Sequence, residues 1–185
     1  AGAAAISVLT EHDYFSGSIE DLTAATRVAS PSNVPVLRKD FIVDEYQIHE
    51  ARSAGADCIL LIIAILDPSQ YADLFAISTS MGMDVLVEVF DEPELDIAME
   101  IEPPIVGVNN RNLKTLKTSL SVFEQLAKKI PSDRIKVAES GMKNSTDVKR
   151  MGRAGAKAVL VGESLMRAGG NVGNLAREMA EIQVS

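Results

Sequence analysis

The chain is poor in the residues that mark several protein classes. Its 185 residues include no tryptophan and a single cysteine, Cys58, which excludes an internal disulfide framework and suits a reducing compartment. Acidic residues outnumber basic ones, 26 to 18, for a formal net charge of −8, so nucleic acid is a poor partner. The longest apolar run, 58–66, has the length of a strand and not the roughly 20 residues of a membrane span. We therefore expect neither nucleic acid nor a membrane as a partner.

What the chain does contain is enough apolar sequence for a core. Hydrophobic residues make up 46% of it, so we expect residues 1–185 to form a single globular domain. The first residues, AGAAAISVLTEHDY, have no basic region and do not resemble a signal peptide. We expect a cytoplasmic protein, or a plastid one if the source is a plant. Because an initiator Met is missing, we also expect the chain to begin inside a longer protein.

Short apolar runs rich in Val and Ile alternate with longer amphipathic segments. The seven runs are 3–9, 34–37, 58–66, 84–89, 104–109, 135–138 and 158–162. Runs this short and almost continuously apolar indicate parallel strands that are buried on both faces. Helix-capping residues open the segments between and after them, namely Ser18, Asp44, Asp67, Asp91, Ser119, Asn144 and Asn171. Strand, loop and helix thus repeat seven times, which predicts an α/β protein with a parallel sheet.

Two parallel α/β folds fit this repeat. A doubly wound sheet usually carries a G-x-G-x-x-G turn after its first strand, and no such turn is present. In a (β/α)8 TIM barrel the active-site residues follow the carboxyl ends of the strands, and polar residues stand at almost every predicted strand end. We favour the barrel, represented here by seven βα units.

The strand ends supply the candidate functional residues. They are Lys39, Phe41, Glu88, Asn109, Arg111, Glu139, Ser140, Gly141, Gly162 and Glu163. A single charged residue such as Lys39 is often only solvated, but Glu88 interrupts an apolar strand and needs a partner or a raised pKa. Gly141 and Gly162 are either turn glycines or part of a phosphate site, which barrels usually build after their last two strands. The spacing predicts a phosphate-binding barrel with Lys39 and Glu88 as acid and base, and no Cys/His cluster supports a metal site.

Five segments together resemble a known family. RKDF followed by IVDEYQI, then VLVEVFDEPEL, GVNNRNL, VAESGM and VLVGES, are similar in kind and order to indole-3-glycerol phosphate synthase. The similarity runs from about residue 14 to residue 168. It implies a TIM barrel of the ribulose-phosphate-binding type and a carbon–carbon lyase of tryptophan biosynthesis. The implied reaction closes the ring of 1-(2-carboxyphenylamino)-1-deoxyribulose 5-phosphate with loss of CO₂ and water, and it needs no cofactor or metal.

The resemblance also implies residue roles. Lys39 matches the general acid, Glu88 the general base, and Asn109 the residue that orients the reacting centre. Phe41 matches an aromatic contact near the anthranilate ring, and the other substrate-binding positions are Arg111, Glu139 and Ser140. Gly141, Gly162 and Glu163 match positions that grip the phosphate through backbone N–H groups. An acidic side chain at 163 is expected to point away from that anion.

The chain departs from the family pattern at its start. The family's first strand, with an E-x-K segment and a Ser-Pro-Ser loop, is absent, so we expect the second to eighth βα units only. Phe90 stands where relatives often have His. The alternative function is therefore an inactive barrel fragment that binds phosphates or needs a complementing N-terminal segment, with self-association through the open barrel edges. Phosphoribosylanthranilate isomerase, which uses a Cys and Asp pair, is disfavoured because Cys58 is not at the carboxyl end of a strand.

Overall fold

The computed structural model describes residues 1–182, which divide into two compact units. Residues 4–87 form one unit, and residues 1–3 together with the chain from Glu88 onward form the other. Strand and helix alternate along both units, as the sequence predicts. Among residues 1–182, no helix combines the length and the apolar character needed to cross a membrane.

The strands and helices are short. The strands are β1 (Ile6–Leu9), β2 (Val36–Lys39), β3 (Cys58–Ile62), β4 (Asp84–Val89), β5 (Ile105–Asn109), β6 (Ile135–Glu139) and β7 (Ala158–Leu160). The helices are α1 (Ile19–Ala29), α2 (Glu45–Ser53), α3 (Pro68–Ser80), α4 (Glu92–Met99), α5 (Ser121–Leu126), α6 (Ser145–Arg153), α7 (Glu163–Arg167) and α8 (Val172–Ala180). Three 3-10 turns, η1 (Ser30–Ser32), η2 (Ile63–Ile65) and η3 (Gly169–Asn171), complete the order.

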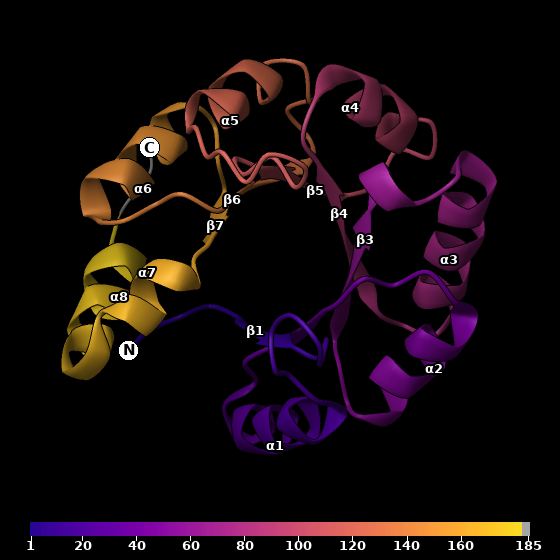
Figure 1. Cartoon of the computed structure of the whole chain (residues 1–185), viewed down its shortest axis with the longest axis horizontal. Coiled ribbons are helices and arrows are strands. Elements are labelled where there is room, and N and C mark those ends of the chain that lie inside the picture. Colours follow the sequence, from indigo (N-terminus) through magenta and orange to yellow (C-terminus); the bar gives the residue numbers. More distant parts are fainter. Residues whose placement is uncertain (183–185) are drawn as a thin grey trace. The chain divides into compact units, whose positions relative to one another are not determined.

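In the unit of residues 4–87, β1, β2 and β3 are parallel and pair in chain order. Leu9 lies opposite Lys39, and Arg38 lies opposite Ile59. Helices α1, α2 and α3 lie along one side of these strands (Figure 1). Leu22 and Ile48, from α1 and α2, are fully buried, so the apolar faces of the helices and strands form the core of this unit.

In the other unit, β5, β6 and β7 are also parallel and pair in chain order. The register sets Asn109 opposite Glu139, and Glu139 opposite Leu160. The carboxyl ends of these strands therefore lie side by side, and the residues that follow them share one edge of the sheet. Helices α4 to α8 surround these strands on their outer side (Figure 1). Strand β4 crosses the boundary, with Glu88 and Val89 in this unit.

The helix ends follow the capping signals of the sequence. Ser18 and Asn144 each accept the backbone N–H of the residue three positions on, both at 3.1 Å, and Asp44 forms a reciprocal capping box with Gln47. These bonds satisfy N–H groups that have no partner within the helix. Gly55 and Gly155 end α2 and α6 with φ of 90° and 104°, the left-handed conformation that the Ala-Gly-Ala turns predict.

Several predicted elements are shorter in the structure, among them one helix and the longest predicted strand. The helix expected after Ser119 covers only Ser121–Leu126, and residues 127–129 continue as turn. The Ser119 hydroxyl bonds to Ser121 Oγ at 2.7 Å and does not cap the helix. The apolar run 58–66 forms a strand only as far as Ile62 and then turns. Hydrophobicity alone contains no stop signal, so the run predicts a longer strand than the one that forms.

Candidate functional site

Lys39 is the last residue of β2 and is half-buried. Its carbonyl oxygen accepts the backbone N–H of Thr10 at 3.2 Å, which extends the pairing of β1 with β2 by one residue. Phe41 follows in the loop with 37% of its surface exposed. The rings of Phe41 and Phe15 are tilted by 33° with centroids 6.3 Å apart, within the range for a favourable aromatic pair. The end of β2 thus presents an amine and a half-exposed aromatic surface.

Glu88 is buried, as its place in an apolar strand predicts, with 2% of its surface exposed. Its Oε1 accepts a hydrogen bond from Nδ2 of the buried Asn109 at 2.9 Å. Asn109 Oδ1 in turn accepts the backbone N–H of Arg111 at 3.0 Å. Asn109 is therefore oriented from both ends, and it provides the partner that a buried carboxylate requires.

The turn after β6 adopts an unusual backbone conformation. Ser140 and Gly141 have φ of 62° and 84°, and they directly follow the buried Glu139. A Cβ at position 141 would lie 2.6 Å from Cγ2 of Thr118, so the loop between β5 and α5 leaves room only for glycine. Successive backbone N–H groups in such a turn can form a concave site for an anion. The positive φ and the close approach of Thr118 by themselves require glycine at position 141.

Glu163 begins α7 directly after Gly162, and both residues are exposed. The Glu163 carboxylate accepts hydrogen bonds from the guanidinium groups of Arg111 and of Arg167, the latter at 2.9 Å. These two cations, Arg111 above all, lower the pKa of Glu163 below its usual value. A Cβ at position 162 would meet no atom within 4 Å, so packing does not explain that glycine.

The unit that starts at Glu88 brings most of the predicted site residues together. The register of β5 with β6, the Glu88–Asn109 bond and the Arg111–Glu163 ion pair connect the ends of β4, β5 and β6 with the start of α7. Lys39 and Phe41 belong to the unit of residues 4–87. Within the described residues, no group of three or more His, Cys, Asp and Glu side chains is arranged to hold a metal ion.

Similarity to known proteins identifies which family of phosphate-binding barrels the chain belongs to. A family model of indole-3-glycerol phosphate synthase matches residues 1–179. The chain belongs to the indole-3-glycerol phosphate synthase family. The member from Albidiferax ferrireducens is 53% identical over 167 residues, covering 90% of this chain and 62% of that protein. Indole-3-glycerol phosphate synthase 2 of Ralstonia nicotianae is 46% identical over 183 residues, covering 99% of this chain and 67% of that protein.

Solved structures establish the fold class of this synthase-family chain. The crystal structure of 3-hexulose-6-phosphate synthase from Salmonella typhimurium aligns with a TM-score of 0.78 at 15% identity, over 95% of this chain and 84% of that one. The predicted class, seven βα units of TIM-barrel type, is confirmed. The chain spans 62% of the length of the Albidiferax ferrireducens synthase and of three further curated synthases that it matches.

Three residues near the site had no functional prediction from the sequence. Asn110, fully buried in this family member, donates to the Ser140 carbonyl at 3.2 Å and accepts the backbone N–H of Phe123 at 3.1 Å. Its place beside Asn109 in GVNNRNL was the available signal. Phe15 and Thr10 lie after β1, and no motif in the sequence marks them. Only the folded chain brings them to the end of β2.

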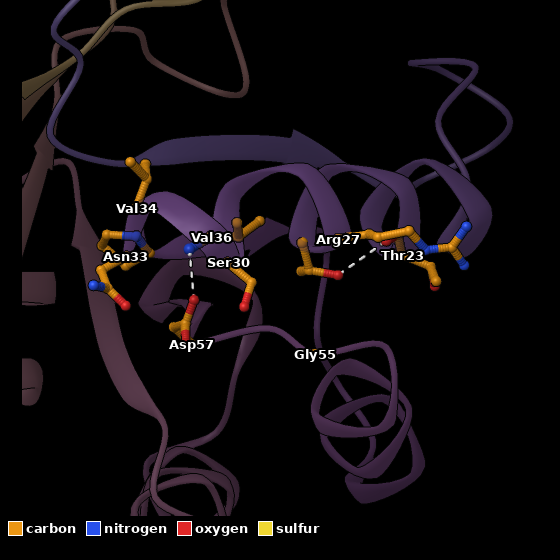
Figure 2. A pocket seen from close by; sticks show the side chains of 10 residues that line it. Thr23, Arg27, Ser30, Asn33, Val34, Val36, Gly55 and Asp57 are labelled. Atoms are coloured by element: carbon orange, nitrogen blue, oxygen red, sulfur yellow. Dashed lines mark hydrogen bonds between the residues drawn. The ribbon is translucent and has the colours of Figure 1, made fainter.

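A surface hollow of this family member lies away from these residues. It is open, measures about 700 Å³, and lies between α1 and the segments that lead into β2 and β3. Arg27, Ser30 and Asn33 line it, and the Asp57 carboxylate accepts the Val36 N–H at 2.8 Å within it (Figure 2). These are the amino-terminal ends of the strands, whereas the candidate catalytic residues follow the carboxyl ends. In a barrel of this class the amino-terminal end contributes to stability.

Proposed function

We propose that the chain carries the activity of its family, the conversion of 1-(2-carboxyphenylamino)-1-deoxyribulose 5-phosphate to indole-3-glycerol phosphate with loss of CO₂ and water. Membership of the family over residues 1–179 is the observation that supports this most strongly. The activity places the protein among the carbon–carbon lyases of tryptophan biosynthesis. It belongs to a single barrel domain in the cytoplasm, a location that the lone Cys58 supports.

In the proposed reaction Lys39 is the general acid. It donates a proton to the substrate carbonyl oxygen as the ring closes and then helps this oxygen to leave as water. Glu88 is the general base that removes a proton in the dehydration, and Asn109 holds its carboxylate in place. The hydrogen bond of 2.9 Å between these two side chains supports this pairing. Proton transfers of this kind require groups that are within hydrogen-bond reach of the reacting atoms.

The remaining site residues bind the substrate in this proposal. Phe41 contacts the anthranilate ring, and its neighbour Phe15 extends the aromatic surface. Arg111, Glu139 and Ser140 contact the polar part of the substrate. Gly141, Gly162 and Glu163 bind the phosphate through their backbone N–H groups. The ion pairs of Glu163 with Arg111 and Arg167 support this, because the two guanidinium groups balance the negative charge of a carboxylate that would otherwise repel the phosphate.

The test replaces Lys39 with alanine and follows turnover by the fluorescence of the indole product. Loss of a general acid typically lowers a rate by about 10²–10⁴-fold, so we expect kcat to fall within that range while the fold is kept. The matched control is Lys149→Ala, which removes an exposed lysine from α6 and should leave turnover unchanged. A Lys39→Ala variant with near wild-type turnover would refute the role.

We further propose that a second copy of the chain pairs with the exposed edge of β1. In the unit of residues 4–87, β1 pairs with β2, and β2 continues to β3. Ile6 and Leu9 of β1 remain 37% and 36% exposed. An apolar strand with an open edge is a template for pairing with another chain.

A further inference from the structure

A buried ionic network lies directly behind Lys39. At its centre is Arg38, which is 3% exposed although it carries a charge. Its guanidinium donates to Thr10 Oγ1 at 3.0 Å, to the Gln47 carbonyl at 2.6 Å and to Asp40 Oδ2 at 3.0 Å, and it pairs with Glu50 Oε2 at 2.9 Å. A buried guanidinium is tolerated only when its donors are satisfied in this way.

Asp40 completes the network from the other side. Its Oδ2 accepts the Thr10 hydroxyl at 2.5 Å as well as Arg38, and its Oδ1 accepts the backbone N–H of Phe41 at 2.8 Å. Thr10 is the connecting element, because its one hydroxyl accepts from Arg38 and donates to Asp40. Removing that hydroxyl leaves two buried charged groups one bond short.

Lys39 stands between the two charged residues of this network. Side chains alternate between the faces of a strand, so Arg38 and Lys39 leave β2 in opposite directions. The Lys39 carbonyl is also bonded to the Thr10 N–H at 3.2 Å. The side chains of Arg38 and Asp40 and the backbone of residues 39 and 41 are therefore held. The origin of the long, flexible lysine side chain is restrained by its neighbours on both sides along the chain.

We infer that Thr10, Arg38 and Asp40 are positioning residues for Lys39. The network fixes the position from which the lysine side chain starts. Its four rotatable bonds therefore bring the ammonium group to the position for proton transfer more often. A misplacement of about 1 Å can cost on the order of 10²-fold in rate. This inference rests on the proposed function, in which Lys39 is the general acid. It assigns the positioning of Lys39 to the network on the opposite face of β2.

The test is a matched pair of substitutions at Thr10, made in the complete gene product that contains this chain. Thr10→Val keeps the shape and removes the hydroxyl, whereas Thr10→Ser keeps the hydroxyl. We expect Thr10→Val to lower kcat roughly tenfold, within the range that misplacement allows, with KM little changed, and Thr10→Ser to restore wild-type kcat. Backbone amides of residues 39–43 should exchange hydrogen faster in Thr10→Val only. Thr23→Val is the control, since Thr23 bonds only within α1.

The outcomes separate the two proposals. If wild type turns over the substrate and Lys39→Ala does not, but Thr10→Val keeps wild-type kcat, the network has no positioning role and the proposed function stands. If wild type has no turnover, both proposals are wrong. Should Thr10→Val fail to fold, Asp40→Asn replaces it, because it withdraws one acceptor oxygen from the same network. A kcat loss in Thr23→Val equal to that in Thr10→Val would assign the effect to general destabilisation and overturn the inference.

Discussion

Glu88 is costly to bury, and in the proposed reaction the same residue serves as the general base. A carboxylate with 2% of its surface exposed needs hydrogen-bond partners, and Asn109 donates to it. This hydrogen bond offsets part of the desolvation cost of the carboxylate, and it also fixes the direction in which the carboxylate points. The neighbouring Asn110 holds the backbone after β6, because its side-chain amide donates to the Ser140 carbonyl.

We predict that Glu88→Gln abolishes most of the turnover without unfolding the protein. The glutamine oxygen can still accept from Asn109, so shape and hydrogen bond are kept while the base is lost. Loss of the base should lower kcat by about 10²–10⁴-fold. Turnover and thermal unfolding measured on the same preparation test this. An unfolded variant whose activity per folded molecule is unchanged would reduce Glu88 to a structural partner of Asn109.

A second residue-level prediction concerns Gly141 and uses Gly155 as its control. Both have positive φ, 84° and 104°, but only a Cβ at 141 would meet an atom within 3 Å. Gly155→Ala should therefore cost only the left-handed strain of about 1–2 kcal/mol. Gly141→Ala should cost clearly more, because Thr118 must also move. Urea unfolding of both variants measures the difference, and equal losses would contradict the packing argument.

At the level of elements, α5 and α6 are joined by one well-aligned ion pair. Arg150 Nε and Nη2 donate to the two carboxylate oxygens of Glu124 at 2.7 and 2.8 Å. This bond, together with the Arg150 charge, lowers the pKa of Glu124. A carboxyl whose folded pKa is lowered contributes stability above its unfolded pKa, and loses that contribution as the pH falls through the folded value.

We predict that Glu124→Gln lowers the urea midpoint slightly at pH 7, because both groups are partly exposed and water screens the pair. The difference from wild type should vanish as the pH falls below about 4, where the wild-type carboxyl also takes up a proton. Arg150→Met and the double variant complete the cycle. A Glu124→Gln effect that persists at low pH, or that is the same in the Arg150→Met background, would show that the ion pair is not its source.

At the scale of the whole molecule, the proposed pairing of two copies through β1 concerns association in solution. Ile6 and Leu9 carry no charge, and β1 has neither a proline nor an inward-facing charge to discourage pairing. Val28 of α1 is also exposed, but it does not offer a pairing edge, because the backbone hydrogen bonds of a helix are made within the helix. If the proposed association occurs, we therefore expect it at β1 and not at α1.

We predict that the weight-average molar mass of the chain, measured by analytical ultracentrifugation, rises with protein concentration. Ile6→Lys should suppress the rise, because a lysine on an edge strand opposes pairing. Val28→Lys places the same charge on α1 and should leave the rise unchanged. A wild-type chain that stays monomeric at every concentration would refute pairing through β1, and equal suppression by both variants would indicate a general charge effect.

The sequence alone determined the alternation of elements and most of the candidate site. Capping residues and apolar periodicity are local signals, so Ser18, Asp44 and Asn144 mark helix starts correctly. The rule that barrel chemistry follows the strand ends selected Glu88 and Asn109 before any contact was known. These two side chains are bonded in the structure. The roles of the site residues in catalysis stay predictions.

Only the tertiary structure decided which distant residues become partners. Thr10 bonds to Asp40 across 30 positions and to Arg38 across 28, and Arg111 binds Glu163 across 52. No periodicity or motif encodes such pairs, because they depend on the register of parallel strands and on where each loop returns. The exposed edge of β1 is decided in the same way, since burial depends on which strand comes to lie beside it. Local patterns thus determine the elements, and long-range packing determines how they act together.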